Sequence, residues 1–167
     1  SLALGDVDGD GDLDLIIGNI GQSRLCLNDG GGIFTDVTTP QMPTRYDHTT
    51  SLALGDVDGD GDLDLVMGNE GPGSYANPQN RLYINNGSGT YTDVTATQMP
   101  TDNEQTTSVA LGDFDGDGDL DLLIGNSGEY SAQNRLYLND GSGTYADFTS
   151  TLLPTTVEST TALALGD

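Results

Sequence analysis

Short apolar segments separated by polar turns run along the whole chain. In residues 13–19, LDLIIGN, alternate apolar side chains occupy one face of an extended strand, and Ile16 lies on the other face. Apolar residues on both faces predict a strand that is buried on both sides. The preceding segment, SLAL at residues 1–4, predicts another strand, and its small Ala3 indicates a crowded position.

Two more strands are predicted further along each repeat. In the second copy they are RLYIN at residues 81–85 and GTYTDVT at residues 89–95. The turn between them, NNGSG, is rich in Asn and Gly, which tolerate positive φ, and it predicts a hairpin. No segment shows helical periodicity. The pattern therefore predicts an all-β fold of four-stranded antiparallel units.

The four-strand pattern occurs three times and then begins again. The first aspartates of the copies fall at positions 6, 56, 113 and 167, which gives periods of 50, 57 and 54 residues. Four-stranded units at this period are typical of β-propeller blades, whereas a linear β-solenoid usually has shorter rungs. We predict one propeller-type region over 1–167, with repeats at 1–50, 51–107 and 108–160 and a partial fourth at 161–167.

The charge of the chain is strongly negative. Asp and Glu number 27 against four Arg and no Lys, and the formal net charge is −23. Nucleic acid and anionic membrane surfaces are therefore poor partners, and no stretch is long and apolar enough for a membrane helix. A disordered acidic tail is disfavoured, because 34% of the residues are hydrophobic.

Fifteen of the acids lie in three loops of the form DxDGDGDLD. Ca²⁺ binds six to eight oxygen ligands, and carboxylates at alternate positions can surround one ion. We predict side-chain ligands at positions 1, 3, 5 and 9, a backbone carbonyl ligand at position 7, and a sharp turn at the glycine of position 6. One Ca²⁺ per loop gives three per chain. The predicted metal-site residues are Asp6, Asp8, Asp10, Asp12, Asp14, Asp56, Asp58, Asp60, Asp62, Asp64, Asp113, Asp115, Asp117, Asp119 and Asp121.

Other readings of these loops fit less well. An EF-hand needs a Glu at position 12 and flanking helices, but position 12 holds Ile17, Met67 or Ile124 and the flanks are strands. Mg²⁺ prefers to keep several waters. Aspartates that merely decorate a turn would repel one another at this density.

The loops and strands together resemble the FG-GAP and VCBS repeats of integrin α-subunit-type propellers, and the phrases NRLYLNDGSGTY and ALGDFDGDGDLDLLIGN resemble bacterial members. The resemblance covers essentially the whole chain. It implies a propeller of six to eight blades, calcium loops joining the first and second strands on one face, and function on an exposed rim or the opposite face. Three blades and one strand do not close such a ring, so we expect further blades from the same polypeptide or from neighbouring copies.

Catalysis needs convergent nucleophile, base and acid groups, and no such set can be assembled. His48 aligns with Gln105 and Ser159 and is expected in a loop. Cys26, aligned with tyrosines, is expected to be a packing residue. The chain is therefore predicted not to be an enzyme.

The arginines recur in phase at Arg24, Arg81 and Arg135, and we expect each to pair with a carboxylate or carbonyl of its own or the adjacent blade. Arg45 lies in a variable linker. Tyr75 and Tyr130 lie in the loops after the second strands, where a rigid scaffold often places recognition.

Three function classes remain open. The preferred one is an extracellular, secreted or cell-surface, calcium-binding structural or adhesion scaffold with a protein or glycan ligand on the cell surface or matrix. The second is a carbohydrate-binding, lectin-like propeller. The third is the non-catalytic part of a larger secreted enzyme. Millimolar extracellular Ca²⁺ would saturate even weak sites, and Asn86-Gly-Ser is a possible glycosylation sequon.

Overall fold

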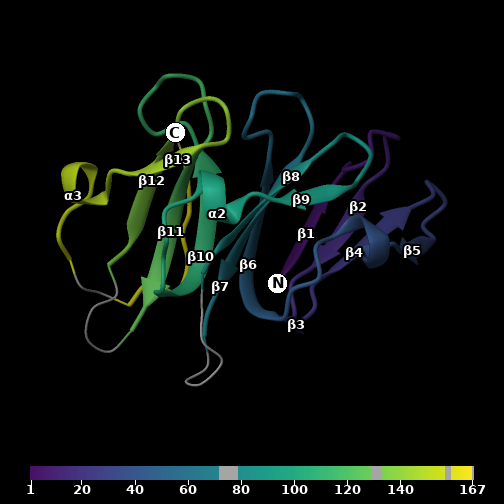
Figure 1. The fold of residues 1–167 in the computed structure, drawn as a ribbon, viewed down its shortest axis with the longest axis horizontal. Coiled ribbons are helices and arrows are strands. Elements are labelled where there is room, and N and C mark those ends of the chain that lie inside the picture. Colours follow the sequence, from purple (N-terminus) through teal and green to yellow (C-terminus); the bar gives the residue numbers. More distant parts are fainter. Residues whose placement is uncertain (72–78, 129–132, 157–158, 167) are drawn as a thin grey trace.

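The computed structural model describes residues 1–71, 79–128, 133–156 and 159–166, and it has three sheets arranged side by side in an arc (Figure 1). The strand order is β1-β2-β4-β5 in blade 1, β6-β7-β8-β9 in blade 2 with β3 added to its edge, and β10-β11-β12-β13 in blade 3. All pairings are antiparallel. The prediction of all-β, four-stranded propeller blades is confirmed.

The bounds of the strands follow the predicted segments. Blade 1 contains β1 (Leu2–Gly5), β2 (Asp14–Ile17), β4 (Arg24–Asn28) and β5 (Phe34–Asp36). The short β3 (Ile20–Gly21) lies between β2 and β4 in the sequence but pairs with β6 of blade 2. Blade 2 contains β6 (Asp47–Gly55), β7 (Asp64–Asn69), β8 (Arg81–Asn85) and β9 (Tyr91–Asp93). Blade 3 contains β10 (Gln105–Gly112), β11 (Asp121–Ser127), β12 (Arg135–Asn139) and β13 (Tyr145–Asp147).

The hydrophobic core lies between blades rather than within them. One cluster joins Val7, Ile16, Leu25 and Met42 of blade 1 to Leu65, Met67, Tyr83 and Tyr91 of blade 2. The other joins Val57, Val66, Leu82 and Met99 of blade 2 to Val109, Leu122, Ile124, Tyr137 and Tyr145 of blade 3. Blade 2 therefore contributes to both clusters, and every residue of β7 is buried.

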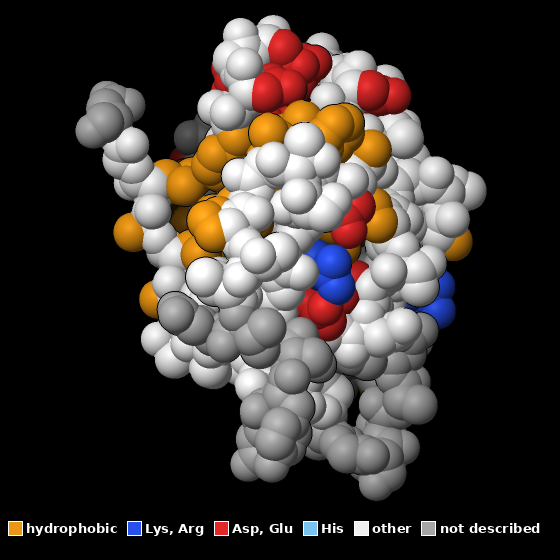
Figure 2. Space-filling model, turned by 90° about the vertical axis from the view of Figure 1, so that its left-hand side faces the viewer, with side chains coloured by type: hydrophobic (Ala, Val, Ile, Leu, Met, Phe, Trp, Pro, Cys, Tyr) orange, Lys and Arg blue, Asp and Glu red, His pale blue; other side chains and the backbone are white. Residues whose placement is uncertain are grey.

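The second strand is thus buried on both faces in blade 2, as predicted, but not in blade 1. The outer flank of blade 1 exposes Leu2 by 67% and Leu4 by 61%, because none of the residues that the structure describes covers it. Hydrophobic side chains also gather on the face formed by blade 3 (Figure 2), where Phe148, Leu152 and Leu165 are exposed.

The blades approach one another closely at a glycine near the end of each second strand. A Cβ built on Gly68 of β7 would lie 2.7 Å from Cγ2 of Thr106 and 2.9 Å from Cγ1 of Val109, both in the next blade. Gly18 meets Thr49 in the same way. The absence of a side chain at this position permits the spacing between the sheets.

The structure also contains short helical turns that the sequence pattern did not predict. A single helical turn follows the fourth strand of every blade: α1 (Thr38–Gln41), α2 (Thr95–Gln98) and α3 (Thr149–Leu152). Its first threonine is buried, and in blade 2 the hydroxyl of Thr95 accepts a hydrogen bond from the backbone of Leu82 at 3.0 Å. Four residues are too few to show periodicity, so the sequence pattern could not reveal these turns.

The described part of the partial repeat, residues 161–166, is not in a strand, although residues 161–167 were expected to begin a fourth blade. It nevertheless packs where such a strand belongs. The backbone N–H of Thr160 donates to the carbonyl of Asn126 at 2.9 Å, as Thr49 does to Asn19 at 3.0 Å. The hydroxyl of Thr107 donates to the carbonyl of Thr160 at 2.6 Å. Residues 160–165 therefore lie on blade 3 as a first strand without a sheet partner among the described residues.

We predict that this unpaired segment and the exposed flanks drive association. An edge with free N–H and C=O groups adds readily to another sheet, and large apolar patches are rarely left to water. The 167-residue chain should elute as an oligomer in size-exclusion chromatography with calcium. A stable, soluble monomer at all concentrations would contradict the prediction.

Candidate metal centre

The three aspartate loops connect the first and second strands of the blades and lie at one end of the sheets (Figure 1). In the first loop the carboxylate of Asp6 draws the chain around itself. Its Oδ1 accepts hydrogen bonds from the backbone N–H groups of Gly9 and Asp10 at 2.9 and 3.1 Å, and its Oδ2 accepts from Gly11 at 3.0 Å. The second loop repeats these bonds at Asp56, at distances of 2.8, 3.1 and 3.0 Å. The first aspartate thus organises the turn as well as offering oxygens to an ion.

The aspartate at position 9 fixes the end of each loop to the sheet. Asp64 is fully buried, and its carboxylate accepts backbone hydrogen bonds from Val57 and Asn85, both at 2.9 Å. The equivalents Asp14 and Asp121 are also 0% exposed and bond the same two positions of their own blades. Burial raises the pKa of Asp64 to about 6. A buried carboxylate needs a compensating partner, and a cation would supply the missing charge.

Each loop brings carboxylates together in a way that suits a metal ion. Ligand oxygens of three residues lie within 4.8 Å of one another in each loop, and the groups are Asp6, Asp8 and Asp10; Asp56, Asp58 and Asp64; and Asp113, Asp115 and Asp121. Positions 1 and 3 take part in all three groups, position 5 in the first, and position 9 in the other two. Desolvation, followed by repulsion between the carboxylates, raises the pKa of Asp58. The residues fit a hard divalent cation, while ligation itself stays a prediction.

The aspartates at position 7, Asp12, Asp62 and Asp119, lie outside these groups. Their carboxylates pack against the second residue of the turn between the third and fourth strands, where a Cβ on Gly30, Gly87 or Gly141 would collide with them. This arrangement leaves the carbonyl at position 7 as the predicted ligand, and it explains why the turn has glycine at that place in all three repeats.

Sequence reasoning missed a contact that links each of the first two loops to the following blade. The side-chain amide of Asn85, at the end of β8, donates to the carbonyl of Val7 in the first loop at 2.7 Å and to that of Leu63 at 3.2 Å. Asn139 makes the same pair of bonds to Val57 and Leu120, at 2.7 and 3.2 Å. The recurrence of Asn at the end of every third strand was the available signal.

The loops are not all held by contacts from a neighbouring blade. Asn28 has no preceding blade among the described residues, and its side-chain N–H group donates to one loop carbonyl, that of Leu13, at 3.2 Å. The third loop, in turn, has no following hairpin among the described residues, and Phe114 at its second position is 38% exposed, whereas Val57 is 1% exposed. The first two loops are therefore fixed by two blades and the third by one.

The remaining sequence predictions can be placed individually. His48 lies in strand β6 and not in a loop, because β6 extends back to Asp47 and pairs there with β3; its Nδ1 is 3.2 Å from Oε1 of Glu70. Cys26 lies in β4, opposite Leu15 and Asp36. Tyr75, Tyr130 and Asp167 lie outside the described residues.

The arginines form the expected pairs. Arg24 pairs with Asp36 and Arg135 with Glu104, while Arg81 makes two bonds to Asp47, at 3.0 and 3.1 Å. Arg45, in the linker between blades 1 and 2, is also paired: its guanidinium lies 2.8 Å from the carboxylate of Asp93. Each of these arginines therefore has a structural partner.

The arc of four-stranded blades with an aspartate loop in each defines a β-propeller-type repeat protein. The chain belongs to the FG-GAP repeat family: the model of the FG-GAP-like repeat matches residues 6–67 and 73–124, and the model of the FG-GAP repeat matches residues 106–144. No curated protein matches it.

A similar fold occurs in a structure solved to explain specific recognition of non-reducing terminal N-acetylglucosamine by an Agrocybe aegerita lectin. The TM-score is 0.53 at 22% identity, and the match covers 87% of this chain and 36% of that one. The chain thus spans about a third of the length of this β-propeller lectin. No helix among the described residues is long and apolar enough to cross a membrane.

We predict that Asn85→Ala weakens calcium binding in the first loop, although Asn85 belongs to blade 2. The change removes both bonds to loop carbonyls and leaves the buried carbonyl of Val7 without a partner, which costs about 1–3 kcal/mol of folding stability. Asn28→Ala is the matched control, since it removes side-chain bonds to Leu13 and Gly32 of its own blade and no contact between blades. Calcium titration calorimetry and urea unfolding of both variants measure the difference. Equal effects would contradict a role for the interblade bond.

Proposed function

We propose that the chain is a non-catalytic, calcium-binding structural or adhesion scaffold that acts outside the cell. The observation that supports this most is the recurrence, in all three repeats, of carboxylate oxygens within 4.8 Å of one another on equivalent loops. Five aspartates per loop carry a charge that the fold must compensate. Three Ca²⁺ would reduce the formal charge from −23 to −17.

Bound Ca²⁺ would connect parts of the chain that the loop already brings close. The predicted side-chain ligands at positions 1, 3 and 5 lie in the partly or fully exposed part of the loop, whereas position 9 is buried at the start of the second strand. An ion bound by both ends would fix the loop to the sheet and, through Asn85 and Asn139, to the next blade. The expected role is rigidity, not chemistry.

The extracellular location and the partner follow from the same proposal. Extracellular modules bind Ca²⁺ with dissociation constants of about 10⁻⁴–10⁻³ M, which suits exposed loops of this kind. A rigid scaffold with variable loops suits a protein or glycan ligand on a cell surface or matrix.

The calcium proposal predicts that the protein melts at a higher temperature in calcium than in EDTA, because a ligand that binds only the native state stabilises it. A hundredfold excess of Ca²⁺ over its dissociation constant adds about 2.7 kcal/mol per site. Differential scanning calorimetry measures the shift, and Mg²⁺ serves as the control ion. A melting temperature that does not respond to EDTA would argue strongly against the proposal.

The variant Asp10→Ala tests the first calcium site by itself. It should weaken the first site and leave the other two near normal, so calorimetric stoichiometry should fall from three sites to two at low Ca²⁺. Asp29→Ala, in the exposed turn between β4 and β5, is a matched control outside the loop.

Two alternatives remain to be separated from the scaffold. The likeness to a β-propeller lectin favours glycan binding as the second candidate, and the chain could also be the non-catalytic part of a larger secreted enzyme. A glycan array in calcium buffer, repeated in EDTA, tests the lectin alternative: calcium-dependent binding of a defined glycan would support it. Absence of binding to any glycan on the array would leave the protein-binding scaffold.

A further inference from the structure

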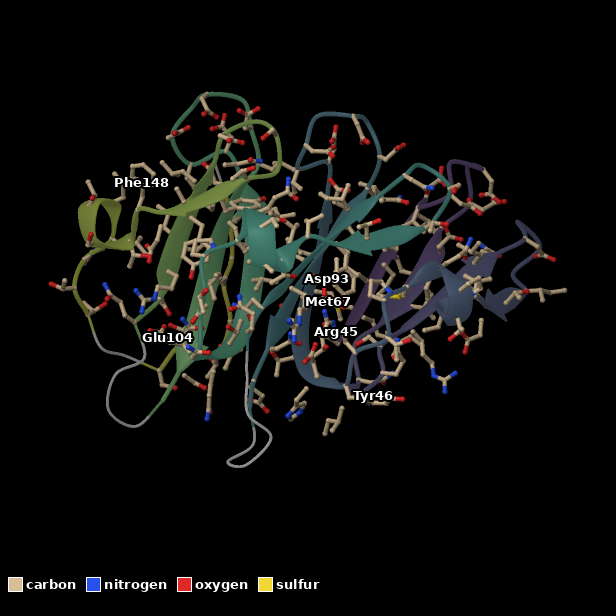
Figure 3. All side chains as sticks on the ribbon, in the orientation of Figure 1. Arg45, Tyr46, Met67, Asp93, Glu104 and Phe148 are labelled. Atoms are coloured by element: carbon tan, nitrogen blue, oxygen red, sulfur yellow. The ribbon has the colours of Figure 1, made fainter. Side chains whose placement is uncertain are left out.

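A second recurring group of charged residues lies at the ends of the strands away from the aspartate loops. It consists of an arginine at the start of the third strand, an acidic residue at or just before the start of the first strand, an aspartate at the end of the fourth strand, and one residue of the linker before the blade. In blade 2 these are Arg81, Asp47, Asp93 and Arg45; in blade 3 they are Arg135, Glu104, Asp147 and Asp102. Arg45, Asp93 and Glu104 are labelled in Figure 3.

At the junction of blades 1 and 2 the charges are balanced. Arg81 binds Asp47 with two hydrogen bonds. Asp93 uses Oδ1 to accept the backbone N–H of Thr95 at 3.1 Å, and its Oδ2 accepts two bonds from the guanidinium of Arg45, at 3.1 and 2.8 Å. Two guanidinium groups therefore face two carboxylates.

At the junction of blades 2 and 3 the second guanidinium is replaced by a carboxylate. Asp147 is held like Asp93, because its Oδ1 accepts the backbone N–H of Thr149 at 2.8 Å. Its Oδ2, however, lies 3.6 Å from Nη1 of Arg135, whose other nitrogens bind Glu104. The linker position that Arg45 occupies in the preceding junction is Asp102. Three carboxylates face one guanidinium here.

The space near Asp147 is a recess of about 320 Å³, lined also by Asp102, Glu104, Arg135 and Tyr137. Asp102 is 4% exposed, and its Oδ2 lies 3.4 Å from both the hydroxyl of Tyr137 and the side-chain amide of Asn80. Figure 2 shows basic atoms flanked by acidic ones on this face of the molecule. The recess therefore combines an excess of negative charge with room for a side chain.

We propose that this recess binds a guanidinium group, namely an arginine side chain of a partner protein. The decisive observation is that the preceding junction holds a guanidinium, that of Arg45, on the equivalent oxygen of the equivalent aspartate. A planar guanidinium suits carboxylate acceptors, and two bonds to one oxygen are already shown by Arg45.

This inference deepens the proposed scaffold role by naming a group that a partner would present, but it does not depend on calcium binding. The recess lies at the end of the sheets away from the aspartate loops. Failure of the calcium proposal would appear as a melting temperature that ignores EDTA, whereas failure of the arginine proposal would appear only in the titrations below.

The test is a titration of the full chain with Nα-acetyl-arginine amide, monitored by ¹H–¹⁵N NMR and carried out both in calcium and in EDTA. The expected result is a saturable shift of amide signals around Tyr137 and Asp147, with a dissociation constant on the order of millimolar for this single-residue probe. Asp147→Asn should weaken binding about tenfold, because it removes the charged acceptor. Asp36→Asn, the equivalent change in blade 1, is the control that should leave binding unchanged.

Exchange of the linker residues makes the test sharper. Asp102→Arg should place a guanidinium on Asp147, as Arg45 does on Asp93, and so abolish binding of the probe. Arg45→Asp should open an equivalent recess at Asp93 and give a second set of shifts. If Arg45→Asp fails to fold, the Asp102→Arg and Asp147→Asn variants still test whether the probe binds in the recess at Asp147.

Three outcomes would overturn the proposal. The first is no saturable binding by the wild-type chain. The second is equal binding by wild type and Asp102→Arg, which would place the probe elsewhere. The third is equal affinity for Nα-acetyl-lysine amide, which would show attraction of any cation and no recognition of a guanidinium.

Discussion

A four-stranded blade cannot cover its own two faces, and this constraint determines the rest of the structure. The hydrophobic clusters each take residues from two blades, so no blade has a core of its own. Burial of apolar surface stabilises folding by about 25 cal/mol per Å², and here that stabilisation arises only when blades are adjacent. The residues at the interfaces are therefore the ones on which stability depends, among them the glycines that permit close approach.

The aspartate loops and the blade interfaces are parts of one system. Position 9 of each loop is buried at the start of the second strand, and position 2 contributes a side chain to the interblade cluster in the first two loops. The amides of Asn85 and Asn139 join these loops to the next blade. An ion that orders a loop would thus also order the interface beside it, since the two share backbone atoms.

Much of the fold was predictable because its signals are local. Alternation of side chains, Asn-Gly turns and the repeat period fix the strands, hairpins and blades within about 50 residues. The helical turns were not predictable, because four residues hold barely one turn. His48 lies in a strand because β6 pairs with β3 at that point, and the residues around His48 give no local signal of this pairing.

In the candidate metal centre, too, local features were predictable and contacts between distant residues were not. The spacing of the aspartates predicted four side-chain ligands per loop, and the structure brings together oxygens of three, without Asp14, Asp60 and Asp117. The contact of the position 7 carboxylates with the glycine of the hairpin turn was not predicted. The bonds of Asn85 to Val7 and of Arg45 to Asp93 join residues 78 and 48 positions apart. Contacts at such separations depend on how blades stack, and a single sequence does not encode them in any local pattern.

The seating of residues 160–165 on blade 3 repeats the seating of residues 49–54 on blade 1 and of residues 106–111 on blade 2. The packing of the first strand against the preceding blade is therefore repeated at every junction, although the charged linker residues, Arg45 and Asp102, differ. Duplication of one repeat within the gene would insert a blade whose first strand packs on the preceding blade in the way already seen here. Such a chain can grow or shrink by whole repeats during evolution, and the same property makes its repeats interchangeable parts for protein engineering.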